Sequence, residues 1–174
     1  DSEEYRDVFP QTLVADDQKA AGKWSTSAGG QYYAAGVGGA LAGRGADLFV
    51  IDDPHSEQEA ALAENNPDVY DKTYEWYTSG PRQRLQPGGK IIMVMTRWST
   101  KDLTGILLSK QKEAKSDQWH VVEFPAIMDH GEPVWPEYWN AEELEKVKAT
   151  LPVAKWNAQW MQRPTSEEGA LIKR

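Results

Sequence analysis

Two short apolar runs without a polar residue constrain the fold of this chain more than any other feature. Leu48–Ile51 ends abruptly at Asp52-Asp53, and Ile91–Met95 ends at Thr96-Arg97. Neither run alternates apolar with polar residues, and this pattern is typical of strands buried on both faces of a parallel sheet. We therefore expect two strands of an α/β sheet, the second beginning at Lys90.

Helical patterns lie between and after these runs. Ser56 with Glu59 has the form of a capping box, which predicts a helix from Ser56 to Ala63. The spacing of Leu103, Ile106 and Leu107 predicts a helix over about residues 100–114. Strands that alternate with helices indicate α/β layers. The other expected elements are strands at 22–27, 31–36 and 119–124, and helices at 67–79, 140–150 and 153–162.

Composition narrows the class of protein. The chain has 174 residues, of which 40% are hydrophobic, and this is enough for about one domain with a core. The lack of cysteine excludes a disulfide-stapled scaffold and fits a reducing compartment. No apolar run is long enough to span a bilayer, so no membrane partner is expected. The start at Asp1 rather than Met favours a processed chain or an excised part of a longer one.

Charge is spread unevenly along the chain. The net charge is −8, yet residues 82–115 hold eight Lys and Arg against two Asp and Glu. Such a stretch could attract the phosphates of DNA. The alternative is an ordinary solvated helix face with scattered lysines, and both interpretations stay open at this level.

The acidic pair after the first apolar run is the main candidate for chemistry. Ligands of open α/β sheets bind beyond the carboxyl ends of the strands, where Asp52-Asp53 and Thr96-Arg97 both lie. In a nucleotide-hydrolysing fold the first carboxylate holds Mg²⁺, and the second orients or deprotonates the attacking water. The alternative is that Asp52-Asp53-Pro54 only begins a turn.

No phosphate-binding loop is evident beside this pair. The pattern G-x-x-x-x-G-K-[ST] is absent, because Gly22-Lys23 precedes Trp24 and Gly89-Lys90 precedes Ile91. The glycine-dense segment Gly36–Gly45 contains no lysine. An ATPase built on this sequence would therefore lack half of its active site.

Several short blocks, in their order along the chain, resemble a known family. Gly43–His55 looks like the Walker B region of the large terminase subunit of tailed bacteriophages, the motor that packages viral DNA. The ordered set extends over about residues 30–174. The further blocks are YEWY at 74–77, RLQPGGK at 84–90, MTRW at 95–98, DL at 102–103, FPAI at 124–127, VWPE at 134–137 and WMQRP at 160–164.

The resemblance implies roles for individual residues. Asp52 corresponds to the Walker B aspartate that binds Mg²⁺ with ATP, and Asp53 stands where many members have a catalytic glutamate. Thr96 and Arg97 fall in the coupling motif, which senses the γ-phosphate and links hydrolysis to DNA movement. Arg44 lies where some members carry an arginine finger that reaches the ATP of a neighbouring subunit; a solvated loop charge is the alternative.

The resemblance also implies a fold and a domain plan. The fold would be a partial P-loop NTPase-type (ASCE-like) parallel sheet flanked by helices, with a small helical lid. Residues 1–135 would form the C-terminal half of an ATPase domain, 136–163 a helical lid or linker, and 164–174 a tail toward an absent nuclease domain. The family's phosphate loop and nuclease have no counterpart here, so DNA cleavage is not expected.

The expected function is that of the ATPase part of a packaging motor, with ATP and Mg²⁺ as cofactors. Expected partners are double-stranded DNA, the portal protein, the small terminase subunit and other copies of the chain in a ring. The expected location is the cytoplasm of the infected bacterial host, at the procapsid portal. Two alternatives stay open: a non-hydrolysing assembly or binding module of the packaging complex, and part of a helicase-like translocase.

The remaining conspicuous side chains are histidines and tryptophans. The three histidines show no metal-ligand spacing, and polar contact within a loop is the expectation for His55. Trp156 and Trp160 are spaced i, i+4, and Trp135 and Trp139 flank Pro136. We expect these four tryptophans to pack the last two helices as a small subdomain.

Overall fold

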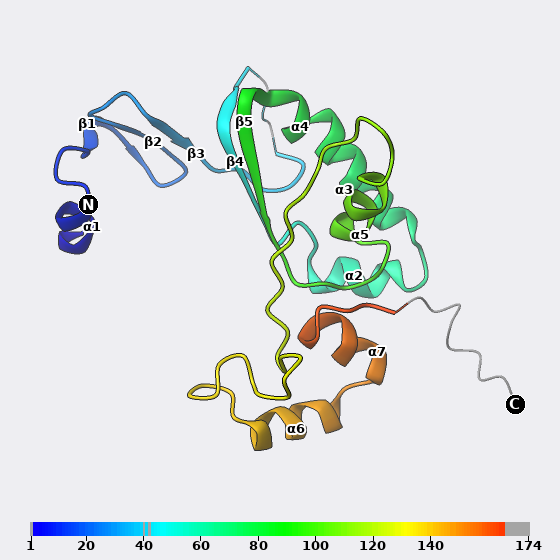
Figure 1. The fold of residues 1–174 in the computed structure, drawn as a ribbon. Coiled ribbons are helices and arrows are strands. Elements are labelled where there is room, and N and C mark those ends of the chain that lie inside the picture. Colours follow the sequence, from blue (N-terminus) through cyan, green and yellow to red (C-terminus); the bar gives the residue numbers. More distant parts are fainter. Residues whose placement is uncertain (1, 40, 42, 166–174) are drawn as a thin grey trace, which may run out of the picture. The chain divides into compact units, whose positions relative to one another are not determined.

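The computed structural model describes residues 2–39, 41 and 43–165, without the side chains of residues 16–19. The chain divides into two compact units, Asp1–Arg44 and Gly45–Arg174 (Figure 1). The domain boundaries expected at 135 and 163 stay predictions. So does any role of the tail after residue 165, which lies outside the described residues.

The first unit is a small antiparallel sheet preceded by a helix. It contains α1 (Glu3–Val8), β1 (Val14–Ala20), β2 (Lys23–Thr26) and β3 (Gln31–Tyr33), with strand order β1-β2-β3. The expected hairpin is confirmed, and Trp24 stacks on its cross-strand partner Tyr32 at 4.8 Å between ring centroids. The sequence pattern did not predict α1 or β1, although Ser2 caps α1 by accepting a hydrogen bond from the Tyr5 amide.

The second unit is built on a parallel strand pair, which confirms the α/β class. β4 (Ala46–Asp52) pairs with β5 (Leu85–Val94), and the register sets Phe49 against Ile91 and Asp52 against Val94. Pro87-Gly88-Gly89 form a bulge within β5, where the register shifts and Gly88 has a φ of 82°. Only a residue without Cβ adopts that backbone conformation at little cost.

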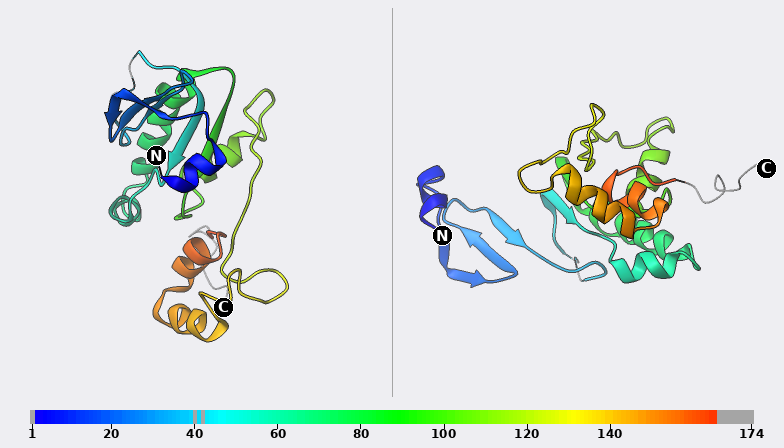
Figure 2. Two further views of the ribbon diagram at one scale, coloured as in Figure 1. Left: turned by 90° about the vertical axis from the view of Figure 1, so that its left-hand side faces the viewer. Right: turned by 90° about the horizontal axis from the view of Figure 1, so that it is seen from below.

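Helices cover one face of this strand pair. The elements are α2 (Glu57–Ala63), α3 (Asp68–Ser79), α4 (Pro81–Arg84) and α5 (Leu103–Lys110), and Figures 1 and 2 show α3 and α5 on the same side of β4 and β5. The core is formed by Ile51, Tyr77, Leu103 and Leu107. Each fully buried side chain of this size contributes about 1.5–3 kcal/mol. The predicted capping box of Ser56 and Glu59 is confirmed at the start of α2.

The other face of the strand pair is exposed, contrary to the two-sided burial that the apolar runs predict. Leu48, Val50, Ile92 and Val94 each keep about half of their surface accessible. Within the described part of the chain, the helices that pack on the sheet cover only the face formed by Phe49, Ile51, Ile91 and Met93. The sequence is therefore more apolar than this structure requires.

Three predicted elements need correction. Residues 119–124 form no strand and join neither sheet of the described chain. The helix expected over 100–114 is the shorter α5, since Asp102 caps it at Leu103. The last helix, expected over 153–162, divides into α7 (Val153–Lys155) and the π-helix η1 (Trp156–Trp160).

The C-terminal helices have a second small core. It joins Ala126, Leu144 and Trp156, and Leu144 belongs to α6 (Ala141–Thr150). Trp160 stacks on Trp156 at 5.7 Å and meets Trp139 edge-on at 5.3 Å, so packing is confirmed for these three tryptophans. Trp135 is 57% exposed and stacks only on Tyr138, so the expectation of core packing was wrong for it.

The helices of the described residues are all too short or too polar to cross a membrane.

The Tyr77 hydroxyl supports a stability prediction. Tyr77 is 2% exposed, its hydroxyl has no hydrogen-bond partner among the described residues, and burial raises its pKa to about 12. An unpaired buried hydroxyl costs about 1–3 kcal/mol. We expect Tyr77→Phe to match the parent protein or exceed its free energy of unfolding by about 1 kcal/mol in urea titrations. Tyr138→Phe, at an exposed position, is the control with no change. A loss above about 1 kcal/mol for Tyr77→Phe would contradict the unpaired hydroxyl.

Candidate functional site

The acidic pair lies where β4 ends. Asp52 is the last residue of β4, and the Asp53 amide donates to the Val94 carbonyl oxygen at 2.9 Å, which continues the pairing with β5 by one residue. Asp53 then turns the chain with a φ of 40°. Asp is several-fold enriched in this left-handed region compared with most residues.

The Asp53 side chain reaches across to the segment that follows β5. Its Oδ1 accepts a hydrogen bond from the Thr96 amide at 3.2 Å. Two groups 43 positions apart in the sequence therefore meet at the carboxyl end of the parallel pair. This is the place where open α/β sheets bind ligands.

The Asp52 carboxylate is available to solvent. Asp52 is exposed, and no hydrogen bond or ion pair to its carboxylate is found in residues 2–39, 41 and 43–165. In the same residues no group of three His, Cys, Asp or Glu side chains could hold a metal. Mg²⁺ in nucleotide sites is held by one or two carboxylates together with phosphates and waters. One open carboxylate fits that kind of shared site and does not fit an all-protein cage.

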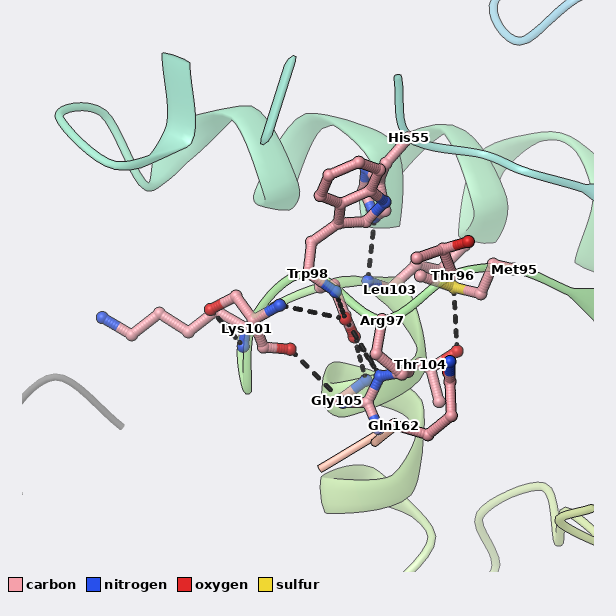
Figure 3. Close-up of polar contacts among 12 residues, drawn as sticks. His55, Met95, Thr96, Arg97, Trp98, Lys101, Leu103, Thr104, Gly105 and Gln162 are labelled. Atoms are coloured by element: carbon pink, nitrogen blue, oxygen red, sulfur yellow. Dashed lines mark hydrogen bonds and ion pairs between the residues drawn. The ribbon is translucent and has the colours of Figure 1, made fainter. Parts of the chain in front are cut away.

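Arg97 is held by a buried carboxylate. Its Nε donates to Asp102 Oδ2 at 3.0 Å, and one of its terminal nitrogens donates to the Ser99 carbonyl oxygen at 3.3 Å (Figure 3). The side chain of Asp102 is fully buried and that of Arg97 is 13% exposed. Breaking such a pair leaves an uncompensated buried charge. The guanidinium of Arg97 thus ties down the loop after β5.

Asp102 also organises the start of α5. Its Oδ2 accepts from the Trp98 and Ser99 amides, and its Oδ1 caps the helix by accepting from the Gly105 amide at 2.8 Å. A Cβ at Gly105 would clash with the Thr100 carbonyl oxygen, so this tight turn requires glycine. Sequence reasoning missed the role of Asp102. The signal was an Asp directly before the apolar helix, which is a preferred N-cap position.

His55 links the loop after β4 to the same helix start. Its Nε2 accepts a hydrogen bond from the Leu103 amide at 2.9 Å (Figure 3). Its Nδ1 lies 3.5 Å from the Thr73 hydroxyl. The ring meets Tyr70 edge-on at 4.9 Å. Because Nε2 is an acceptor, the ring is neutral with its proton on Nδ1. The predicted polar contact of His55 is confirmed, although the residue is buried.

Arg44 belongs to the first unit. Its guanidinium carbon lies 4.1 Å from the centroid of the Tyr33 ring, a cation–π contact. The finger role expected for Arg44 stays a prediction.

The basic stretch is partly neutralised. Arg82 pairs with Asp117 at 2.6 Å and Lys110 lies 3.8 Å from Glu113, in addition to the Arg97–Asp102 pair. At least three of its eight basic residues therefore have acidic partners. The expected DNA contact stays a prediction.

No protein-family model matches the chain, and a search of curated proteins found no match. The roles of the residues in the candidate site are therefore inferred from its geometry and from the sequence.

The Arg97–Asp102 pair supports a prediction on stability. We expect Asp102→Ala to lower the free energy of unfolding by about 3–5 kcal/mol, because it leaves the Arg97 charge and the helix amides without a partner. Asp117→Ala breaks the half-exposed pair with Arg82 and is the matched control, with an expected loss of at most about 1 kcal/mol. Urea titrations of the two variants measure the difference. Equal losses of unfolding free energy in the two variants would contradict a larger contribution from the buried Arg97–Asp102 pair.

His55 predicts a pH dependence of stability. Burial lowers the pKa of His55 below its ordinary value, against the opposing effect of Asp102 and Glu59. The unfolded chain therefore binds the proton more readily, so the stabilisation is present above about pH 6.5 and is lost as pH falls below it. We expect the free energy of unfolding of the parent to decline from pH 7 to pH 5 more steeply than that of His55→Gln. His130→Gln, at an exposed loop position, should keep the parental slope. If His55→Gln keeps the parental dependence of unfolding free energy on pH, His55 is not the group responsible for it.

Proposed function

We propose that this chain is the part of a viral DNA-packaging ATPase, the large terminase subunit, that carries its Walker B and coupling segments. The contact between Asp53 Oδ1 and the Thr96 amide carries the proposal. It joins the acidic end of one parallel strand to the segment after the next. A group that acts on water and a group that senses a phosphate have to be neighbours for hydrolysis to drive movement.

Each residue then has a role at the carboxyl end of the strands. Asp52, with its open carboxylate, would hold the Mg²⁺ of bound ATP, which supplies charge neutralisation at the phosphates. Asp53 has one oxygen on the Thr96 amide, and its other oxygen remains to orient a water or accept its proton. Arg97, held by Asp102, is a positioning residue for the Thr96 loop. Arg44 would act as a finger toward the ATP of a neighbouring copy.

The proposal requires elements that this sequence does not contain. It has no G-x-x-x-x-G-K-[ST] loop, so the phosphates need a cradle from another segment of polypeptide. The fold would then be of the P-loop NTPase type. Double-stranded DNA, portal protein, small terminase subunit and a ring of copies would be the partners, in the host cytoplasm at the procapsid portal.

A non-hydrolysing assembly module is the second candidate. It is favoured by the exposed apolar face of β4 and β5, formed by Leu48, Val50, Ile92 and Val94. Large apolar patches on soluble proteins mark interaction surfaces.

Titration of the isotopically labelled chain with Mg·ATP tests the ATPase proposal. We expect magnesium-dependent chemical-shift changes at the amides of Asp52, Asp53 and His55 and of residues 95–97. Asp52→Asn should weaken the apparent affinity about tenfold or more, because a charge-assisted contact of about 1.5–3 kcal/mol is lost. Glu57→Gln removes an exposed carboxylate of α2 and should leave the affinity unchanged. The same shifts in Asp52→Asn would count against the magnesium role.

A hydrolysis assay tests whether the site in this chain is complete. We expect the 174-residue chain alone to show no ATP turnover above background, because it lacks the phosphate loop. Turnover that Asp52→Ala abolishes would show that the site is already complete. Absence of both turnover and magnesium-dependent shifts would favour the assembly module.

A further inference from the structure

One edge of β5 has no partner strand. Among the described residues β5 pairs only with β4, so the amides and carbonyls along its other edge are not in a ladder. Ile91–Met95 contains no charge and no proline, the devices by which exposed edges are ordinarily protected. This edge has the composition of a central strand.

A cleft of about 510 Å³ opens along that edge. Ile91–Val94 of β5 and the following Met95 line one wall, and residues 119–124 line the other. Thr104, Leu107 and Leu108 of α5 contribute as well. Figures 1 and 2 show that residues 119–124, which follow the loop after α5, run in the same direction as β5. The second wall is therefore extended chain with the orientation of a parallel neighbour.

The second wall also lacks a ladder. Residues 120–124 pair with no strand in the described part of the chain, although Trp119 to Phe124 has the pattern of a strand. Val122 and Phe124 are 63% and 70% exposed. Two segments without a ladder on these sides line one cleft, and their backbone donors and acceptors are available for one further strand between them.

The lining defines the chemistry of that strand. Among the lining residues, Arg97 and Glu123 carry a formal charge, and most of the others are apolar. The strand would also extend a sheet with apolar side chains on both faces, Ile91 and Met93 on one and Ile92 and Val94 on the other. A continuous uncharged run, and not an alternating one, fits this place.

We propose that this cleft accepts an uncharged β-strand of another polypeptide segment, which pairs in parallel with β5 on one side and with residues 119–124 on the other. Backbone pairing gives such a strand its affinity, and the apolar walls select its side chains. The strand ends at the same edge of the sheet as Asp53 and Thr96, because the carboxyl ends of parallel strands lie together. The proposal is independent of ATP hydrolysis.

Two other occupants fit less well. Symmetric pairing of β5 with β5 of a second copy is blocked by residues 119–124, which line the cleft along the same edge. Within residues 166–174, the apolar run is Ala170-Leu171-Ile172 between Gly169 and Lys173, which is shorter than the five or six residues of a common strand.

Amide hydrogen exchange with a peptide probe tests the proposal on the whole chain. The probe has about five valines and isoleucines in a row between lysine-flanked ends, and a control peptide carries serine at every second position of that run. We expect the first peptide to slow exchange about tenfold or more at residues 91–95 and also at residues 120–124. The control peptide should produce no such protection.

Variants distinguish binding in the cleft from nonspecific adsorption of an apolar peptide. Ile92→Lys places a charge in the cleft, and Val122→Pro removes a backbone donor from the wall formed by residues 119–124. Both variants should abolish the protection that the first peptide gives. Leu62→Lys changes an equally exposed residue of α2 outside the lining and should retain it.

Four outcomes would overturn the proposal. Protection of β5 alone would describe an open edge, and protection of both walls without peptide in the monomer would mean that they already pair with each other. Protection that rises with protein concentration, together with a dimer mass, would identify a second copy as the occupant. Loss of basal protection on removing residues 166–174 would identify the chain's own tail.

Discussion

The buried carboxylate of Asp102 is the interaction on which the candidate site depends. It accepts hydrogen bonds from Arg97, from the Trp98 and Ser99 amides and from the first turn of α5. These contacts fix the loop after β5. One residue further on, the Leu103 amide bonds to His55 in the loop after β4. The start of α5 therefore anchors both loops, and the distance between Asp53 and Thr96 follows from that anchoring.

The sheet formed by β4 and β5 has an exposed face and a free edge, although the loops at its carboxyl end are well anchored. Helices bury Phe49, Ile51, Ile91 and Met93, while Leu48, Val50, Ile92 and Val94 stay about half accessible. Burial of an apolar side chain of this size is worth about 1.5–3 kcal/mol, so these exposed positions leave a substantial free energy unused. The same sheet has a free edge beside a cleft. Both features support the proposal that a further strand joins β4 and β5.

Prediction from sequence succeeded where the signal was local or followed from strand direction. The apolar runs of β4 and β5 predicted a parallel pair, and parallel direction brings Asp53 and Thr96 to the same edge of the sheet. It failed for residues 119–124, because a strand exists only where a neighbour completes its ladder. It failed for Trp135, because the burial of a tryptophan depends on what the chain folds against it. Asp102 was missed even though an Asp before an apolar helix is a local signal.

The sequence by itself determined the two parallel strands, the capping of α2 and the position of the acidic pair at a strand end. These features depend on the polarity of consecutive residues and on hydrogen bonds between neighbours in the chain. Only the tertiary structure decided that Arg97 and Asp102 form a buried pair, that His55 bonds to Leu103 across 48 positions, and that one sheet face stays open. Those features depend on which distant segments meet, and no short window of sequence contains that information.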